Sequence, residues 1–130
     1  MTLILDTNAY SDWRRTGRWN ENLAIADRVL VPSIVIGELH HGFRVGGRFQ
    51  ENAASLDEFL GEPQVEVVAA SRQTAEIYGE FLYFLREKGT PIPTNDIWIA
   101  AMVRETGGKL LTRDSHFECL PQVELERERR

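Results

Sequence analysis

The chain has 130 residues, of which 42% are hydrophobic and 27% are charged, and this size and composition predict one globular domain with a buried core. Its formal net charge of −5 argues against binding of nucleic acid through an overall positive field, but it leaves room for an acidic pocket with arginines around it. Because Cys119 is the single cysteine, no internal disulfide can form, and the apolar stretches are too short to span a bilayer. We therefore expect a soluble, cytoplasmic protein with no membrane association.

The first half of the chain alternates between strand and helix patterns. Strands are predicted over residues 3–5 and 29–32, and helices over residues 11–28, 33–45 and 48–63. The turn-tolerant pair Thr7 and Asn8 is expected to bound the first strand. Gly17 breaks the first of these helices, Ser33 can cap the second, and Pro63 ends the third.

The second half continues the alternation. Strands are predicted over residues 65–70 and 109–112, helices over residues 71–88 and 94–108, and a candidate short fifth strand over residues 123–126. Ser71 is a capping residue for the first of these helices, and Gly89 closes it. We expect the domain to span residues 1–125 and to be followed by a charged tail, residues 126–130, with no apolar face to bury.

Strands separated by helices predict an α/β fold with a parallel sheet covered on both faces, in which ligands gather beyond the carboxyl ends of the strands. Asp6 directly follows the first strand and Asp114 follows the fourth at one residue's distance, so both should emerge at the same edge of the sheet. Asp96 lies in the first turn of its helix, and the sequence leaves open which edge that turn faces. Glu38 flanks the apolar stripe of its helix, with Gly42 one turn later.

Each of these acids also has a simpler explanation. Asp96 can complement a helix dipole, Asp6 can form an Asx-turn, and Asp114 can cap a small turn, while Glu38 can pair with a basic residue. Together the four acids favour a ligand site, because clustered carboxylates repel one another and a divalent cation removes that conflict. A site made of oxygen ligands suits Mg²⁺ or Mn²⁺ better than Zn²⁺.

Four short motifs carry a family resemblance. They are "LDTNAY" around Asp6, "VIGELHHG" around Glu38, "PTNDIWIAA" around Asp96 and "TRDSHF" around Asp114. In order, spacing and total length the chain resembles PIN-domain endoribonucleases, specifically the VapC-type toxins of prokaryotic toxin–antitoxin systems. The resemblance covers essentially the whole chain.

The resemblance implies a three-layer α/β/α sandwich on a mostly parallel sheet. It implies that the catalytic and metal-binding residues, which hold Mg²⁺ or Mn²⁺, are Asp6, Glu38, Asp96 and Asp114. It also implies that Asn8 and Thr112 are polar residues supporting the site. His116 is a departure, because some relatives carry a further acid at that position.

The same resemblance implies an activity and partners. A metal-activated water would hydrolyse the phosphodiester bonds of RNA, such as tRNA or another structured RNA, and leave a 5′-phosphate and a 3′-hydroxyl. A small VapB-type antitoxin protein would neutralise the enzyme by filling an apolar groove, and a homodimer and a higher toxin–antitoxin complex are expected. For the RNA backbone the first candidate is Arg113, followed by Arg14 and Arg15.

Two further questions stay open at this stage. The aromatic residues Tyr10, Trp13 and Trp19 fit either a partner groove or seam, or the ordinary core. The alternative functions are a PIN-type nuclease that processes RNA or cleaves DNA without an antitoxin, and a non-catalytic module with an acidic pocket. A receiver-like module is a poor match, because the strand at residues 65–70 ends without an acid that could accept a phosphoryl group.

Overall fold

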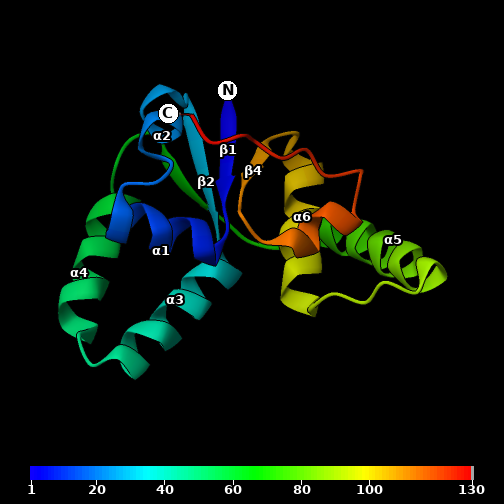
Figure 1. The fold of residues 1–130 in the computed structure, drawn as a ribbon, viewed down its shortest axis with the longest axis horizontal. Helices are drawn as coiled ribbons and strands as arrows, with labels where there is room; N and C mark the ends of the chain where they lie inside the picture. The colour runs from blue at the N-terminus through cyan, green and yellow to red at the C-terminus, as the bar shows by residue number, and fades with distance from the viewer. Residues whose placement is uncertain (130) are drawn as a thin grey trace.

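The computed structural model describes residues 1–129 as a strand and helix alternation close to the predicted one (Figure 1). In chain order the elements are β1 (Thr2–Leu5), α1 (Thr7–Thr16), α2 (Asn20–Ile25), β2 (Arg28–Pro32), α3 (Ser33–Gly46), α4 (Phe49–Leu60), β3 (Val65–Val68), α5 (Arg72–Lys88), α6 (Thr94–Thr106), β4 (Lys109–Leu111) and the 3₁₀ helix η1 (Ser115–Cys119).

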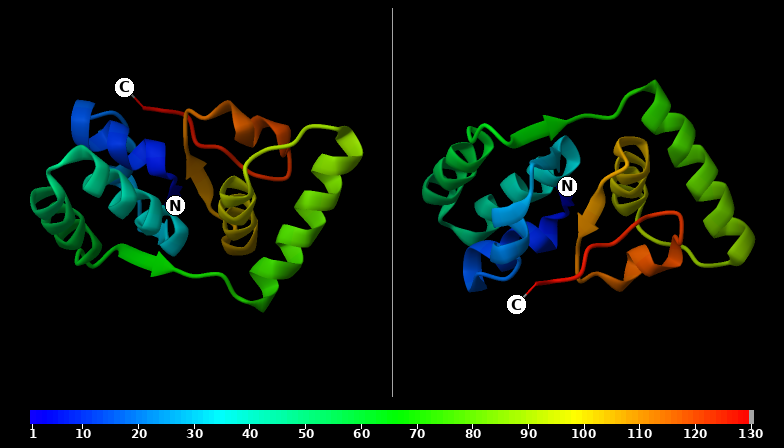
Figure 2. Two further views of the ribbon diagram at one scale, coloured as in Figure 1. Left: turned by 90° about the horizontal axis from the view of Figure 1, so that it is seen from below. Right: turned by 90° about the horizontal axis from the view of Figure 1, so that it is seen from above.

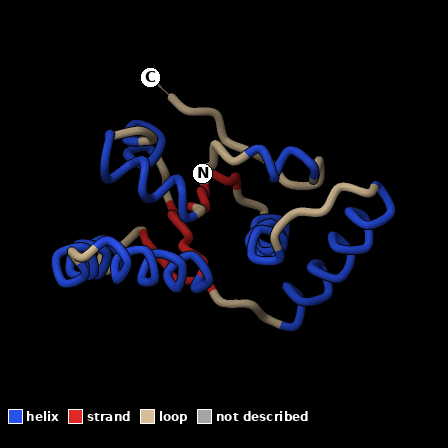
Figure 3. Tube along the Cα trace, turned by 60° about the horizontal axis from the view of Figure 1, so that its bottom comes forward, coloured by secondary structure: helices blue, strands red, loops and turns tan. Residues whose placement is uncertain are grey.

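The four strands form one sheet in the order β3-β2-β1-β4, and every neighbouring pair is parallel. β1 is therefore paired on both sides, with Leu3 opposite Val29 of β2 and Lys109 of β4. Helices α1, α3 and α4 lie on one side of the sheet and α5 and α6 on the other (Figure 2), so that the strands run through the middle of the molecule (Figure 3). The predicted α/β/α arrangement with a parallel sheet is confirmed.

Burial explains why β1 reads as an unbroken apolar run. Leu3, Ile4 and Leu5 are all 0% exposed, because both faces of a parallel sheet are covered by helices. Helix α6 is buried almost all round, since it packs between the sheet and α5, and it provides six of the buried residues: Ile97, Ile99, Ala100, Ala101, Met102 and Val103. Asp6, at the carboxyl end of β1, is thus attached to a rigid core.

The segment after β1 is helical, and the predicted turn at Thr7 and Asn8 is wrong. Helix α1 begins at Thr7, directly after the strand, and Asp6 is its N-cap. The Asp6 carboxylate accepts a hydrogen bond from the backbone N–H of Ala9 at 2.7 Å, which satisfies one of the free N–H groups at the start of a helix. The predicted break at Gly17 is confirmed, because Gly17 ends α1 in the left-handed region with a φ of 77°.

Two smaller expectations also differ from the structure. Ser33 is the first residue of α3 and makes no side-chain capping bond, because the preceding residue, Pro32, occupies the cap position. Residues 123–126 do not form a fifth strand but contribute one isolated bridge, between Leu125 and Leu110. By contrast, Ser71 caps α5 as predicted, through a reciprocal pair of bonds with Thr74.

The charged C-terminal residues lie against the domain. The backbone N–H of Glu126 donates to the carbonyl oxygen of Leu110 in β4 at 3.0 Å. The buried side chain of Asn22 in α2 donates to the carbonyl oxygen of Arg127 at 2.8 Å and accepts from the backbone N–H of Arg129 at 2.9 Å. Residues 126–129 are therefore held by backbone bonds although they have no apolar face, and Arg130 lies outside the described residues. Within residues 1–129, no helix has the length and apolar character needed to cross a membrane.

Candidate active site

The four predicted acids line one pocket at the carboxyl edge of the sheet. The pocket has a volume of about 140 Å³ and is lined by Asp6, Thr7, Asn8, Glu38, Asp96, Ile99 and Asp114. The acids come from four separate segments, which are the start of α1, the second turn of α3, the first turn of α6 and the loop after β4. The question of which edge the start of α6 faces is therefore resolved, because Asp96 lies at the same edge as the other three acids.

Asp6 is the most deeply placed acid, with 4% of its surface exposed. Besides the N–H of Ala9, its carboxylate accepts a hydrogen bond from the hydroxyl of Thr112. Burial raises the pKa of Asp6 to about 6; these two hydrogen bonds oppose the rise, and the carboxylates of Asp114 and Asp96 add to it. The protein alone thus stabilises the ionised form of Asp6 less well than water does.

Thr112 joins two of the acids. Its hydroxyl donates to Asp6 and accepts a hydrogen bond from the backbone N–H of Asp114 at 2.9 Å. The Asp114 side chain in turn accepts from the backbone N–H of His116 at 2.9 Å and caps η1. The supporting role that the resemblance implies for Thr112 thus has a geometric basis in both of these contacts.

Thr7 holds Glu38 and was not predicted as a site residue. Its hydroxyl donates to Oε1 of Glu38 at 2.7 Å, which directs the Glu38 side chain toward the start of α1. No local pattern indicates this contact, because Thr7 suits a turn as well as the first residue of a helix. Asn8, the other predicted supporting residue, lines the pocket next to Thr7.

Asp96 and Asp114 share a contact with His116. The ring nitrogen Nδ1 of His116 lies 3.0 Å from Oδ2 of Asp96 and 3.2 Å from Oδ1 of Asp114. Burial raises the pKa of Asp96, the hydrogen bond with His116 lowers it, and the Asp114 carboxylate raises it again. One donor atom from each of the three side chains falls in a group spanning at most 4.8 Å, as is needed to hold a metal ion.

Residues 3–121 match the family model described as the PIN domain. The chain belongs to the PIN-domain family.

Relatives of this PIN domain include VapC proteins. Ribonuclease VapC2 of Rickettsia felis is 29% identical over 132 residues, which cover 97% of each chain. A chain in the crystal structure of VapBC2 from Rickettsia felis, bound to a DNA fragment from their promoter, superposes with a TM-score of 0.88 at 27% identity, covering 99% of this chain and 100% of that one. A chain of the DNA-bound VapBC from Salmonella typhimurium gives a TM-score of 0.82 at 26% identity and 97% coverage of both chains. The resemblance to VapC-type toxins is confirmed.

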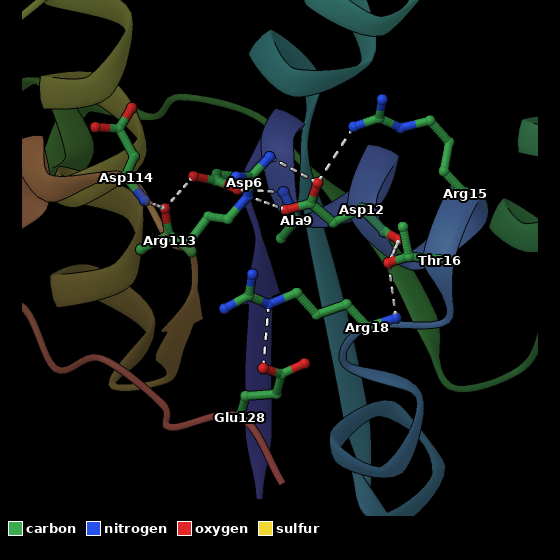
Figure 4. Close-up of polar contacts among 10 residues, drawn as sticks. Asp6, Ala9, Asp12, Arg15, Thr16, Arg18, Arg113, Asp114 and Glu128 are labelled. Atoms are coloured by element: carbon green, nitrogen blue, oxygen red, sulfur yellow. Dashed lines mark hydrogen bonds and ion pairs between the residues drawn. The ribbon is translucent and has the colours of Figure 1, made fainter. Parts of the chain in front are cut away.

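The arginines predicted to contact RNA already have partners within this PIN domain. Arg113 binds Asp12 of α1 through two nitrogens, Nε and Nη2, with Nη2 at 2.9 Å from Oδ1 (Figure 4). Arg15 approaches the same carboxylate at 3.4 Å. Asp12 is 4% exposed and was not predicted, since nothing in its position on a helix distinguishes it from a surface acid. The Arg113 side chain still has about half of its surface exposed, beside the acidic pocket.

Arg14 and the aromatic residues near it hold α1 against α4. The Arg14 guanidinium donates to the carbonyl oxygen of Ser55 at 3.2 Å and lies over the Trp13 ring, 4.7 Å from its centroid. Tyr10 and Trp13 both contact the ring of Phe59. Tyr10 and Trp19 are each only 3% exposed, so in this PIN domain they belong to the core.

Proposed function

We propose that this PIN domain is a metal-dependent endoribonuclease toxin of the VapC type, whose catalytic and metal-binding residues are Asp6, Glu38, Asp96 and Asp114. The observation that carries the proposal is the convergence of these acids, from four segments, on one pocket. The VapC ribonuclease name of the relatives and their nearly complete coverage of this chain support the activity.

The pocket fits a hard divalent cation, Mg²⁺ or Mn²⁺. Its carboxylates have uncharged supports, Thr7 for Glu38 and Thr112 for Asp6, so their negative charge remains available to an ion. The raised pKa of Asp6 points the same way, because burial leaves this carboxylate under-stabilised until a cation is nearby. Oxygen-rich ligand sets are those that Mg²⁺ and Mn²⁺ prefer.

The substrate we propose is RNA, with tRNA or another structured RNA as the favoured class. A bound divalent ion would lower the pKa of a water molecule and neutralise charge building up on the phosphate. The chain's own part is to hold the acids in fixed orientations, and no side chain is required as a nucleophile. Hydrolysis by water leaves a 5′-phosphate and a 3′-hydroxyl, which distinguishes it from cleavage through the ribose 2′-oxygen.

The partner we propose is a small VapB-type antitoxin. A groove of about 620 Å³ lies between α1, α3 and α4 and includes the apolar side chains of Leu39 and Phe43. It shares Thr7, Asn8 and Glu38 with the acidic pocket, so a chain bound in the groove would reach the acids directly. The related chains named above were solved in VapBC complexes, which supports a toxin–antitoxin assembly for this protein. Within such an assembly we also propose a homodimer.

The first test of this function replaces Asp96 with Asn. Asp96→Asn removes a metal-binding charge with almost no change in side-chain volume, and we expect RNA cleavage to fall by at least about 100-fold while the circular dichroism spectrum is unchanged. Asp57→Asn, on the exposed side of α4, is the matched control and should cleave normally. Full, metal-dependent cleavage by Asp96→Asn would contradict the assignment.

A second test separates a toxin from a nuclease that has no antitoxin. Expression of the protein alone should arrest growth, and co-expression of the small protein encoded next to it should restore growth. Sequencing of the RNA ends after induction would identify the substrate and the 5′-phosphate product. Growth arrest that persists in the Asp6→Asn variant would exclude catalysis as its cause.

A further inference from the structure

His116 is a histidine that contacts two of the four acids of the pocket. Its Nδ1 faces the carboxylates of Asp96 and Asp114 at 3.0 and 3.2 Å, and its side chain is about half exposed. Its backbone N–H is also bonded to Asp114, so the start of η1 fixes the base of the side chain. The ring is therefore held with one nitrogen facing the carboxylates of Asp96 and Asp114.

These separations suit neighbouring ligands of one ion. Two ligands at right angles around an octahedral divalent ion, with bonds of about 2.1–2.2 Å, lie about 3.0 Å apart. The two distances from Nδ1 agree with that spacing, and the donor atoms of the three residues lie within 4.8 Å of one another. The arrangement offers two oxygens and one nitrogen on the Asp96 side of the pocket.

We propose that His116 is itself a metal ligand, binding through Nδ1 together with Asp96 and Asp114, and that this nitrogen makes the site prefer Mn²⁺ to Mg²⁺. The inference rests on the proposed metal-dependent function and adds the identity of the ion. Mg²⁺ favours oxygen ligands and exchanges them reluctantly for nitrogen. Imidazole is a ligand of transition metals rather than of Mg²⁺, and Mn²⁺ is a transition metal that also suits carboxylates.

Pulsed electron paramagnetic resonance of bound Mn²⁺ tests the ligation directly. The wild-type protein with Mn²⁺ should show a hyperfine coupling to ¹⁴N, and His116→Ala should abolish it. His40→Ala is the control, because His40 packs against the rings of Phe43 and Phe49 and is not one of the three residues whose donor atoms lie within 4.8 Å of one another. It should keep the coupling.

Metal affinities test the preference. By isothermal titration, we expect His116→Asp to bind Mg²⁺ more tightly than the wild type and to lower the ratio of Mn²⁺ to Mg²⁺ affinity by about 10-fold or more, since an oxygen replaces the nitrogen. If His116 only orients the two acids, His116→Ala should weaken both ions by a similar factor, in the range of about 10–100-fold.

The possible results distinguish a failure of the His116 proposal from a failure of the proposed nuclease function. Mn²⁺ binding and RNA cleavage without a ¹⁴N coupling would overturn the ligand role of His116 and leave the nuclease proposal standing. An unchanged affinity ratio in His116→Asp would overturn the preference. A wild-type protein that binds neither ion and cleaves no RNA would overturn both proposals.

Discussion

Two threonine hydroxyls decide how the acids of the pocket are presented. Thr7 directs Glu38, and Thr112 bridges the side chain of Asp6 and the backbone of Asp114. Within residues 1–129, no lysine or arginine forms an ion pair with any of the four acids. The side chains that support Glu38 and Asp6 are thus neutral hydroxyl groups, which orient a carboxylate without cancelling the charge that a cation needs.

The hydroxyl of Thr112, which bridges Asp6 and Asp114, can be tested by removing it alone. Thr112→Val keeps the shape of the side chain but removes its bonds to Asp6 and Asp114, and we expect metal affinity and RNA cleavage to fall by about 10–100-fold, as for other residues that orient metal ligands. Thr112→Ser retains the hydroxyl and should retain most of both. Titration calorimetry with Mn²⁺ and cleavage assays measure the effect, and equal losses in the two variants would count against the bridge.

The pair of Arg113 and Asp12 gives a second prediction. Arg113→Ala leaves the buried Asp12 carboxylate with the longer contact from Arg15, so we expect a lower melting temperature as well as any loss of RNA binding. Arg15→Ala removes one contact of 3.4 Å and should change the melting temperature less. Thermal unfolding of both variants, with and without Asp12→Asn, measures the coupling. A melting temperature unaffected by Arg113→Ala would contradict a stabilising role for this pair.

At the scale of the elements, two segments between or after the helices shape the sheet and the pocket: the junction of β1 with α1 and the C-terminal residues. Helix α1 begins directly after β1, so Asp6 is the one residue between them: it follows the strand, caps the helix and lines the pocket. At the other end of the chain, residues 126–129 are held by β4 and by the buried Asn22 of α2. The sheet edge at β4 is therefore covered by the C-terminal segment, which protects an otherwise open strand edge.

Asn22 allows the role of that segment to be tested. Asn22 is 0% exposed, and Asn22→Ala removes two bonds to the backbone, so we expect the free energy of unfolding to fall by about 1–3 kcal/mol. The C-terminal residues should also be cut faster by carboxypeptidase. Asn20→Ala, an exposed position in the same helix, is the control. Similar digestion rates for the two variants would mean that the segment is held by other contacts.

At the scale of the whole molecule, the buried acids of the pocket make the free energy of unfolding depend on pH. The folded protein keeps the Asp6 proton up to a pH of about 6, whereas the unfolded chain releases it near its ordinary pKa. The folded state binds more protons over this interval, so this contribution to stability is complete below pH about 4 and is lost as the pH rises through 6. The raised pKa of Asp96 acts in the same direction.

This linkage predicts how metal and pH act together. In metal-free protein, the loss from Asp6 between pH about 4 and 6 is on the order of 3 kcal/mol, and Asp6→Asn should remove that part of the pH dependence. Mn²⁺ or Mg²⁺ should raise the melting temperature more at pH 7.5 than at pH 5, because protons compete for the same carboxylates. Differential scanning calorimetry of both proteins with EDTA and with metal measures this. An equal metal effect at the two pH values would contradict the linkage.

The sequence predicts the strands and helices that have a clear apolar period or a breaking or capping residue. It does not predict the contacts between residues far apart in the chain. The strand at residues 3–5, the break at Gly17 and the Ser71 cap follow from local patterns, and the structure has all three. The helix predicted from residue 11 begins four residues earlier, at Thr7, because Thr7 and Asn8 suit a turn as well as a first helical turn. The pairing of Arg113 with Asp12 joins residues 101 positions apart, and no local pattern carries that information.

The position of β1 between β2 and β4 has a consequence for synthesis. The ribosome makes β1 about 100 residues before β4, so the strand that precedes the first acid waits for its second neighbour until Lys109–Leu111 have been made. A nascent chain that stops before Lys109 lacks both that strand and Asp114, which lines the pocket. If the proposed site is the catalytic one, fragments released before Asp114 should therefore cleave no RNA.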